Sequence, residues 1–303
     1  MNTLVVGGTG MIGAHIAELL AAQGHGVTIM ARREGSSEDP AQIVGMPRLV
    51  ADYTDVTDPS ALEPFEQVVF AAGQDIRHIP ADEEGDEIWE RVQTRGVPAF
   101  ADAARRAGVR RFVQIGSYYH QLYPEWAKNL PYVAARKAAD ERTRALTDDT
   151  FAAITLNPPS IVGAIQGSSL RRFARMFSWL RGERPENVFA PPGGTNYMSV
   201  RSLAEATLGA LERGEPGTAY LIGDQNLRYQ EFFQVLADVA GSTLRVPERD
   251  EECPYQPDRF IVQGRGRVIA YQPSPADVAT LSYRRDDVRD AVEKIQREIS
   301  KAW

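Results

Sequence analysis

Four glycines near the start of the chain have the spacing of a turn that can bind an anion. They occupy positions 7, 8, 10 and 13 in the segment LVVGGTGMIG, and a helical pattern that includes Ile16 and Leu20 follows at once. A strand, a glycine turn and a helix in this order direct unpaired backbone N–H groups and the positive end of the helix dipole at an anion. The G-x-x-G-x-x-G spacing also fits an ordinary strand-to-helix turn, but its position and flanks favour the pyrophosphate of a dinucleotide. We expect the contacts to come from Gly7, Thr9, Gly10, Met11, Ile12 and Gly13.

Two consecutive arginines, Arg32 and Arg33, follow the apolar run VTIMA at 27–31. In dinucleotide-binding sheets an acidic residue at the end of the second strand binds the ribose 2′-hydroxyl, whereas an arginine there pairs with a 2′-phosphate through its forked guanidinium. The two side chains could instead face solvent. The sequence favours NADP(H) over NAD(H), with Arg32 as the better candidate.

The elements that must position these residues alternate between strand and helix as far as Pro158. Apolar runs predict strands at 3–6, 27–31, 48–51, 68–72, 112–116 and 151–156, and helical patterns lie at about 12–23, 59–63, 88–107 and 132–146. This alternation predicts an α/β fold, a doubly wound parallel sheet of the Rossmann type with helices on both faces. Ligands bind beyond the carboxyl ends of such strands. The glycine turn should therefore share one crevice with Arg32, Asp52, Gly73 and Ser117.

The alternation ends after Pro158, and the remaining sequence predicts a smaller C-terminal lobe that binds the substrate. Helical patterns lie at 168–182, 201–213, 229–240 and 286–301, a strand pattern at 219–223, and 246–275 shows no clear pattern. We expect a dinucleotide-binding domain of residues 1–163, with 199–223 returning to it. Residues 164–198 and 224–303 should form the lobe.

The composition narrows the class of protein. With 303 residues, 43% hydrophobic and 25% charged, the chain is typical of a soluble globular protein, and its net charge of −7 argues against nucleic acid as the main partner. A single cysteine, Cys253, excludes an internal disulfide, and the four histidines (His15, His25, His78 and His120) lack ligand spacing, so no metal site is expected. Apolar runs are shorter than the roughly 20 residues of a membrane span, and the first strand starts too early for a signal peptide. We expect a cytoplasmic protein that does not bind membranes.

Several further segments follow the glycine turn GGTGMIG in a characteristic order. They are ADYTD at 51–55, AAG at 71–73, AARRAGVRRFVQIGS at 103–117, PYVAARKAADE at 131–141 and LNPPSIVG at 156–163. Together they resemble the extended short-chain dehydrogenase/reductase family, also called the NAD-dependent epimerase/dehydratase family. The resemblance implies cofactor contacts to adenine, ribose and nicotinamide from Asp52, Tyr53, Ala71, Ala72, Gly73, Tyr132, Arg136, Pro158 and Ser160. It also implies a homodimer joined through the helices near 88–107 and 132–146.

The resemblance implies catalytic roles as well. Tyr132 would exchange a proton with the substrate oxygen while hydride passes between the nicotinamide and carbon, and Ser117 would hold that oxygen. A tyrosine, whose ordinary pKa is about 10, needs nearby positive charge for this role. Tyr132 could instead be a core aromatic at the start of a helix. Tyr118 and Tyr119 could share the role of Ser117, although pocket lining or packing in the core is the interpretation we favour for them.

The family pattern has lysine four residues after the tyrosine, where this chain has Arg136, and Lys137 comes one residue later. Four residues advance a helix by about 400°, which leaves Arg136 about 40° from Tyr132, whereas Lys137 is about 140° away. Arg136 is therefore the candidate cation. Because arginine does not shuttle a proton, it is not equivalent to lysine. Gln93 and Asn157 also depart from the family pattern, which often has asparagine and arginine there.

These observations predict an NADP(H)-dependent oxidoreductase of the carbonyl reductase or alcohol dehydrogenase type. Aromatic residues near the expected pocket favour a small lipophilic or aromatic substrate; they are Trp89, Tyr119, Trp126, Phe177 and Trp179. Arg171, Arg172 and Arg175 could contact an anionic substrate, although a solvated helix face is the preferred interpretation. Two alternatives remain open: a nucleotide-sugar epimerase or dehydratase, and a cofactor-binding sensor or scaffold that has lost activity.

Overall fold

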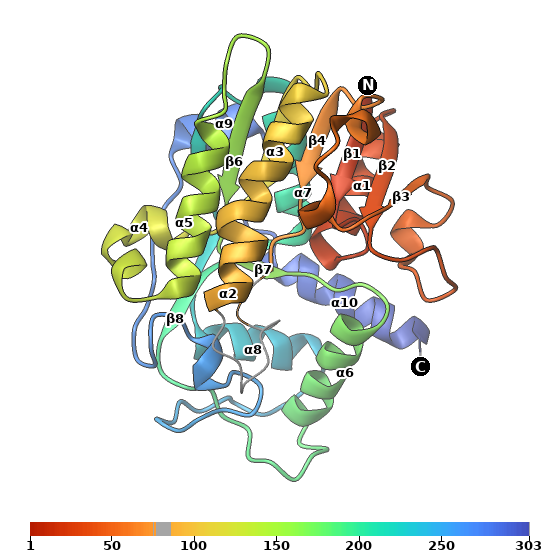
Figure 1. The fold of residues 1–303 in the computed structure, drawn as a ribbon. Helices are drawn as coiled ribbons and strands as arrows, with labels where there is room; N and C mark the ends of the chain where they lie inside the picture. Colours follow the sequence, from red (N-terminus) through yellow and green to blue (C-terminus); the bar gives the residue numbers. More distant parts are fainter. Residues whose placement is uncertain (75, 77–85, 303) are drawn as a thin grey trace. The chain divides into compact units, whose positions relative to one another are not determined.

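The computed structural model describes residues 1–74, 76 and 86–302, so His78 lies outside the described residues. The chain forms two compact units, whose course along the sequence is drawn in Figure 1. The first contains Met1–Pro158, Leu203–Ile222 and Ser274–Tyr283. The second contains Pro159–Ser202, Gly223–Pro273 and Arg284–Trp303.

This division differs from the expected one at 159–163, 199–202 and Gly223, which belong to the second unit, and at Ser274–Tyr283, which belongs to the first. The segment carries α9 (Pro275–Leu281), which packs against α7 (Val200–Arg213). A Cβ at Gly209 would overlap the Leu281 backbone, and Arg213 Nε donates to the Thr280 carbonyl at 2.8 Å. This close approach of two backbones ties α9 to the first unit.

A seven-stranded sheet forms the centre of the first unit. Its order is β3 (Arg48–Val50), β2 (Gly26–Ala31), β1 (Asn2–Val6), β4 (Gln67–Phe70), β5 (Arg111–Ile115), β6 (Ala152–Asn157) and β9 (Ala219–Leu221). Every pair is parallel. The chain proceeds from β1 towards one edge and from β4 towards the other, so the order reverses between β1 and β4, where such sheets bind ligands. The expected α/β Rossmann-type sheet is confirmed.

Helices cover both faces of this sheet, with α3 and α5 in front of it and α1 and α7 behind it in Figure 1. The helices of the first unit are α1 (Met11–Ala22), α2 (Asp86–Trp89), α3 (Gly96–Arg106), α4 (Tyr119–Leu122), α5 (Pro131–Arg144), α9 and most of α7. Short 3-10 turns lie at 41–43, 53–55, 59–62 and 124–128, so the helix expected at 59–63 is a 3-10 turn. In the described part of the chain, no helix is long and apolar enough to cross a membrane.

The helix expected over 88–107 is interrupted by a π-helical stretch, Glu90–Arg95, between α2 and α3. Two side chains take backbone carbonyls of this stretch as acceptors. Tyr53 Oη donates to the Val92 oxygen at 2.6 Å, and Arg142 donates to the Thr94 oxygen at 2.9 Å. Because side chains that bind helix carbonyls disturb the regular ladder, these bonds account for the wider turn.

One core of the first unit lies between the sheet and the pair α3–α5. Leu4 and Val6 point into it from β1, and the aromatic rings of Phe70, Phe100 and Phe112 pack together at centroid distances of 5.8 to 6.4 Å. Strands buried on both faces read as continuous apolar runs. The apolar runs therefore predicted the strands of this unit to within one or two residues.

The second unit is built on a three-stranded sheet with the order β10 (Gln225–Arg228), β8 (Gly194–Ser199) and β7 (Ser160–Val162). Its helices are α6 (Ser168–Leu180), α8 (Tyr229–Val239) and α10 (Val288–Ala302), with a 3-10 turn at 258–260. Apolar residues of these helices enclose a core that contains Trp179, Phe233 and the free thiol of Cys253. Sequence patterns predicted the three helices but none of these strands.

Candidate active site

The glycine turn joins β1 to α1 and lies against the end of β4. Gly7 has φ of +80°, and a Cβ there would be 2.8 Å from the Ala72 backbone, so both conformation and space require glycine. A Cβ at Gly13 would overlap the Gly7 carbonyl oxygen. Ala71 and Ala72 thus lie beside the turn, directly after β4, and Gly73 follows them next to Arg136.

The amino end of α1 has the features of an anion site. Gly10 is its N-cap, and within the described chain no side chain caps this end or places a carboxylate in its first turn. The first N–H groups, from Met11 and Ile12 onward, are therefore available to a ligand. A Cβ at Gly10 would meet only the Gly7 oxygen, at 3.3 Å, so the fold itself leaves this position open. These residues fit a bound pyrophosphate.

Arg32 and Arg33 follow β2 directly, and both side chains are exposed. Arg48 Nη1 donates to the Arg33 carbonyl at 2.9 Å, and among the described residues neither guanidinium of this pair forms a hydrogen bond. The guanidinium of Arg32 lies close enough to the buried Tyr53 hydroxyl to influence its ionisation. Arg32 therefore lies at a strand end of the expected crevice with its charge accessible.

Asp52 and Tyr53 follow β3 and have different surroundings. Asp52 Oδ1 accepts from the Thr54 N–H at 3.0 Å and from its hydroxyl at 2.9 Å. Tyr53 is 8% exposed, and its ring packs at 4.9 Å from Phe70. Burial, and then the charge of Asp52, raises the pKa of Tyr53. The Tyr53 side chain belongs to the core, which leaves its backbone for a cofactor.

Ser117 comes directly after β5, at the carboxyl edge of the sheet, and is buried. Its N–H donates to Asn157 Oδ1 at 2.9 Å. The next residue, Tyr118, donates its N–H to the Pro158 carbonyl at 3.3 Å. Strand ends β5 and β6 therefore bring Ser117, Asn157 and Pro158 together. Ser160 begins β7 in the second unit, and its predicted contact with the cofactor remains a prediction.

Tyr132 lies in the first turn of α5, directly after Pro131, and is partly exposed. Its ring is 5.2 Å from that of Trp89 and 6.2 Å from that of Tyr119, measured between centroids. Tyr119 in turn lies 6.1 Å from Trp126. Three aromatic side chains therefore surround the predicted proton donor or connect to it through ring contacts.

Arg136 faces inward from α5 and is 6% exposed, whereas the Lys137 side chain is 38% exposed and lies 3.8 Å from Glu141. The helix geometry predicted this orientation. The guanidinium donates from Nη2 to the Ile115 and Gly116 carbonyls and from Nη1 to Gln93 Oε1 at 3.4 Å. Its Nε is buried and has no hydrogen-bond partner among the described residues. The charge is thus held at the carboxyl end of β5, one helical turn after Tyr132.

A buried carboxylate, Asp140, is the functional candidate that sequence reasoning missed. It is 1% exposed and accepts from His120 Nε2 at 2.7 Å, Arg144 Nε at 2.5 Å and Asn157 Nδ2 at 3.3 Å. Burial would raise the pKa of Asp140, but the hydrogen bonds from His120 and Arg144 lower it to about 2. The signal was present in the sequence, because Tyr132, Arg136, Asp140 and Arg144 are spaced four apart and share one helix face.

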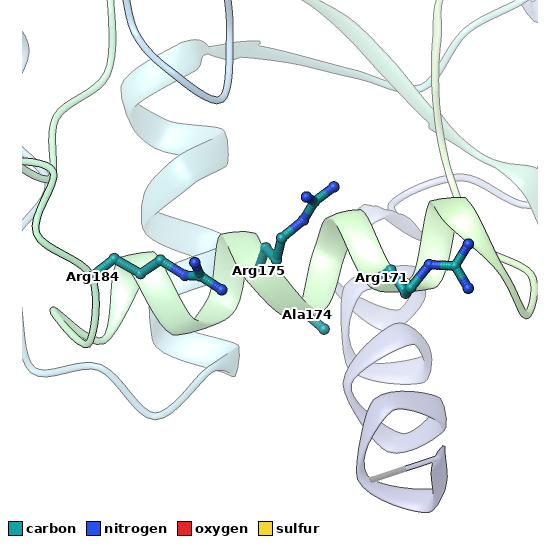
Figure 2. A pocket seen from close by; sticks show the side chains of 4 residues that line it. All are labelled: Arg171, Ala174, Arg175 and Arg184. Atoms are coloured by element: carbon teal, nitrogen blue, oxygen red, sulfur yellow. The ribbon is translucent and has the colours of Figure 1, made fainter.

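The second unit contains a separate pocket of about 340 Å³ lined by Arg171, Ala174, Arg175 and Arg184. Arg171 and Arg175 extend from α6, and Arg184 extends back along the helix from the segment that follows it (Figure 2). Within the described residues, the structure pairs neither Arg171 nor Arg175 with a carboxylate. The neighbouring Arg172 donates to the Tyr255 carbonyl at 3.5 Å instead. In the described part of the chain, no group of acidic, histidine or cysteine side chains could hold a metal ion.

Comparison with known proteins identifies the family. Residues 3–223 match the NAD dependent epimerase/dehydratase family. The chain belongs to this family. It is therefore an NAD(P)-dependent oxidoreductase of the extended short-chain dehydrogenase type, and the sequence-based assignment is confirmed.

Individual relatives are named for different activities. The chain is 28% identical over 277 residues to sterol demethylase protein B of Methylococcus capsulatus, which covers 82% of this chain and 78% of the relative. It is 26% identical over 245 residues to a 3-diazoavenalumate denitrifying reductase of a Streptomyces species, covering 74% and 77%. The structure of UDP-glucose 4-epimerase from Thermotoga maritima, with UDP-glucose, has a TM-score of 0.74 at 16% identity over 100% of this chain and 99% of that one. This last similarity shows the fold alone.

Proposed function

We propose that this family member is an NADP(H)-dependent carbonyl reductase or alcohol dehydrogenase for small lipophilic or aromatic molecules. The surroundings of Tyr132 carry the proposal. Its hydroxyl-bearing ring contacts the ring of Trp89 at a tilted angle and that of Tyr119 edge to face, with Trp126 next to Tyr119. Aromatic rings at these distances provide flat apolar surface beside the proton donor. Two relatives act, by their names, on a sterol and on a diazo compound, which supports a substrate other than a nucleotide sugar.

In this proposal three side chains of the protein take part in the reaction. The bound nicotinamide supplies or accepts the hydride. Tyr132 donates its phenolic proton to the carbonyl oxygen during reduction and takes it back during oxidation. Ser117 donates a hydrogen bond to the same oxygen and fixes its position. Arg136, one helical turn after Tyr132, favours the phenolate form through its positive charge.

The cofactor would be held by the glycine turn and by Arg32. The first N–H groups of α1 would bind the pyrophosphate, and Ala71–Gly73, which follow β4, would hold the ribose. Arg32 would pair with the 2′-phosphate, because its exposed guanidinium follows β2 and forms no hydrogen bond among the described residues. Asp52 Oδ1 is already bonded to Thr54, which leaves Oδ2 for adenine. NADP(H) is therefore the proposed cofactor, with NAD(H) as the weaker ligand.

The decisive experiment is turnover of NADPH, followed by its absorbance, with a panel of aromatic ketones and aldehydes and with aliphatic carbonyls of similar size. We expect oxidation of NADPH with the aromatic members. Binding of the nucleotide without turnover of any carbonyl would instead favour the sensor or scaffold interpretation. Absence of nucleotide binding at millimolar concentration would overturn the proposal altogether.

A nucleotide-sugar epimerase or dehydratase is the second candidate. The observation that favours it is the pocket of the second unit, because the guanidinium groups of Arg171, Arg175 and Arg184 suit phosphate. Product analysis after incubation with UDP-glucose or dTDP-glucose tests this candidate directly. A new sugar nucleotide that is lost in an Arg171→Ala/Arg175→Ala double variant would favour it over the carbonyl reductase.

The homodimer implied by the family resemblance is proposed here as well. It would form through α3 and α5, which lie side by side on one face of the sheet (Figure 1). Light scattering after size-exclusion chromatography distinguishes a dimer from a monomer of 303 residues. A charge reversal at the exposed Arg142 of α5 should then shift a dimer towards the monomer.

A further inference from the structure

One peptide group at the end of β5, between Gly116 and Ser117, is held on both sides by buried side chains. Arg136 Nη2 donates to the Gly116 carbonyl oxygen and, at 3.0 Å, to the Ile115 oxygen. On the other side, Asn157 Oδ1 accepts from the Ser117 N–H at 2.9 Å. Arg136 is 6% exposed and Asn157 is fully buried, so water does not replace these bonds easily. Rotation of the peptide that carries Ser117 would break both.

The two side chains that hold this peptide are themselves held. Arg136 Nη1 donates to Gln93 Oε1 at 3.4 Å. Asn157 Nδ2 donates to Gln121 Oε1 at 2.9 Å and to Asp140 Oδ2 at 3.3 Å. Because a carboxylate only accepts, Asp140 fixes which end of the Asn157 amide faces Ser117. The network therefore fixes both the position of the Asn157 amide and the direction in which its Oδ1 faces the Ser117 N–H.

Two glycines provide the room that this arrangement needs. An ideal Cβ at Gly73 would be 2.5 Å from Nη1 of Arg136, and one at Gly116 would overlap Asn157 Oδ1. A guanidinium presents several donors in a rigid plane and reaches Gln93 and two carbonyls at once. A lysine ammonium at position 136 is a single point charge and would not span the same three acceptors.

We propose that Arg136 and Asn157 are positioning residues for Ser117, which hold its peptide from opposite sides and thereby fix the serine hydroxyl at the substrate oxygen. The inference rests on the proposed function, in which that hydroxyl binds the reacting carbonyl. Beside the effect of its charge on Tyr132, which Arg136→Lys retains, Arg136 acts through the Gly116–Ser117 peptide, with its Nη1 and Nη2 donors committed to protein acceptors. A displacement of about 1 Å at such a hydroxyl can lower a rate by roughly 100-fold.

The test is a double-mutant cycle on the NADPH-dependent reduction of an aromatic ketone such as acetophenone. Arg136→Lys and Asn157→Ser should each lower kcat by roughly 10- to 100-fold in the wild-type background. In a Ser117→Ala background the same changes should alter kcat by less than about twofold, because the hydroxyl that they position is gone. Equal losses in both backgrounds would overturn the proposal. They would show that Arg136 and Asn157 act independently of Ser117.

A second measurement does not depend on turnover. Amide hydrogen exchange of the peptide that covers β5 and Ser117 should become faster by about tenfold or more in Arg136→Lys and in Asn157→Ser. Lys137→Arg is the matched control, because Lys137 lies on the same helix and its exposed side chain pairs only with Glu141 among the described residues, at 3.8 Å. The control should leave exchange around Ser117 unchanged. Unchanged protection in the first two variants would contradict the proposal.

Two further comparisons distinguish a folding defect from a loss of positioning, and a wrong positioning role from a wrong proposed function. If Arg136→Lys does not fold, Gln93→Asn gives the same cycle, because it withdraws the acceptor of Nη1 together with the 3.5 Å bond from Gln93 Nε2 to the Gln74 carbonyl. A loss of kcat in Gln93→Asn that vanishes with Ser117→Ala supports the proposal, and no loss or a persistent one opposes it. If Ser117→Ala and Tyr132→Phe both leave turnover intact, the proposed function itself is wrong. If they abolish turnover but the cycle is additive, only the positioning role is wrong.

Discussion

The buried carboxylate Asp140 allows a prediction whose size follows from the structure. Its pKa is lowered from 3.8 to about 2. One pKa unit corresponds to about 1.4 kcal/mol, so the ionised form stabilises the folded protein by roughly 2 kcal/mol at neutral pH. Asn at this position resembles the protonated carboxyl. We therefore expect Asp140→Asn to lose roughly 2 kcal/mol of unfolding free energy at pH 7.

The pH dependence gives this prediction its sign. The folded-state pKa of Asp140 lies below the unfolded-state value, so its contribution is complete well above 3.8 and is lost as the pH falls towards 2. The difference in unfolding free energy between wild type and Asp140→Asn should therefore fall to roughly half of its neutral-pH value by about pH 3. Urea unfolding, followed by tryptophan fluorescence at several pH values, measures both curves.

A matched control separates this effect from the general acid sensitivity of the protein. Asp102 lies on α3 with a side chain that is 37% exposed, and it pairs with Arg105 at 3.0 Å and Arg106 at 3.1 Å. Exposed ion pairs contribute little, so Asp102→Asn should change the unfolding free energy much less than Asp140→Asn. The reasoning would be refuted if wild type and Asp140→Asn had the same unfolding free energy at pH 7, or if their difference stayed constant down to pH 3.

Three further predictions concern the proposed reaction. Tyr132→Phe should lower kcat for carbonyl reduction by at least about 100-fold while NADPH affinity, measured by fluorescence titration, changes little; undiminished turnover would remove Tyr132 as the proton donor. Arg32→Ala should weaken NADPH binding by about tenfold or more and leave NADH binding nearly unchanged, and an equal loss for both nucleotides would contradict the 2′-phosphate contact. Gly10→Val should weaken both nucleotides without lowering the melting temperature by more than a few degrees, because only the Gly7 oxygen, at 3.3 Å, is near the added Cβ. Nucleotide affinity that survives this change would place the pyrophosphate elsewhere.

The sequence predicted the first unit well because its information is local. Parallel strands buried on both faces produce apolar runs, and the glycine turn records both the positive φ of Gly7 and the close approach to Ala72. The inward orientation of Arg136 followed from helix periodicity alone, since four residues return to the same face. The interruption at Glu90–Arg95 was not predictable, because it depends on hydrogen bonds from Tyr53 and Arg142, which lie about 40 to 50 residues away along the chain.

The strands of the second unit escaped prediction for a different reason. β8 reads GTNYMS, a mostly polar segment in which every residue is nevertheless buried. Its Asn196 donates to Asn226 at 2.7 Å and accepts from the Asp224 N–H at 2.8 Å. Buried polar residues are tolerated when distant partners satisfy them, and the pattern of one strand does not show those partners. Apolar periodicity therefore fails where long-range hydrogen bonds replace hydrophobic burial.

The same limit explains the main gap in the predicted site. Gln93, Arg136 and Asn157 looked in the sequence like three unrelated departures from the family pattern, and only Arg136 received a role. In the folded chain all three belong to one hydrogen-bonded network. This network includes Asp140 and holds the Gly116–Ser117 peptide in place. Because side chains in such a network act as a unit, a single change at position 136 is not a test of arginine against lysine. Arg136→Lys would place lysine among partners arranged for a guanidinium, and we therefore expect it to slow this enzyme even though lysine is the usual residue of the family.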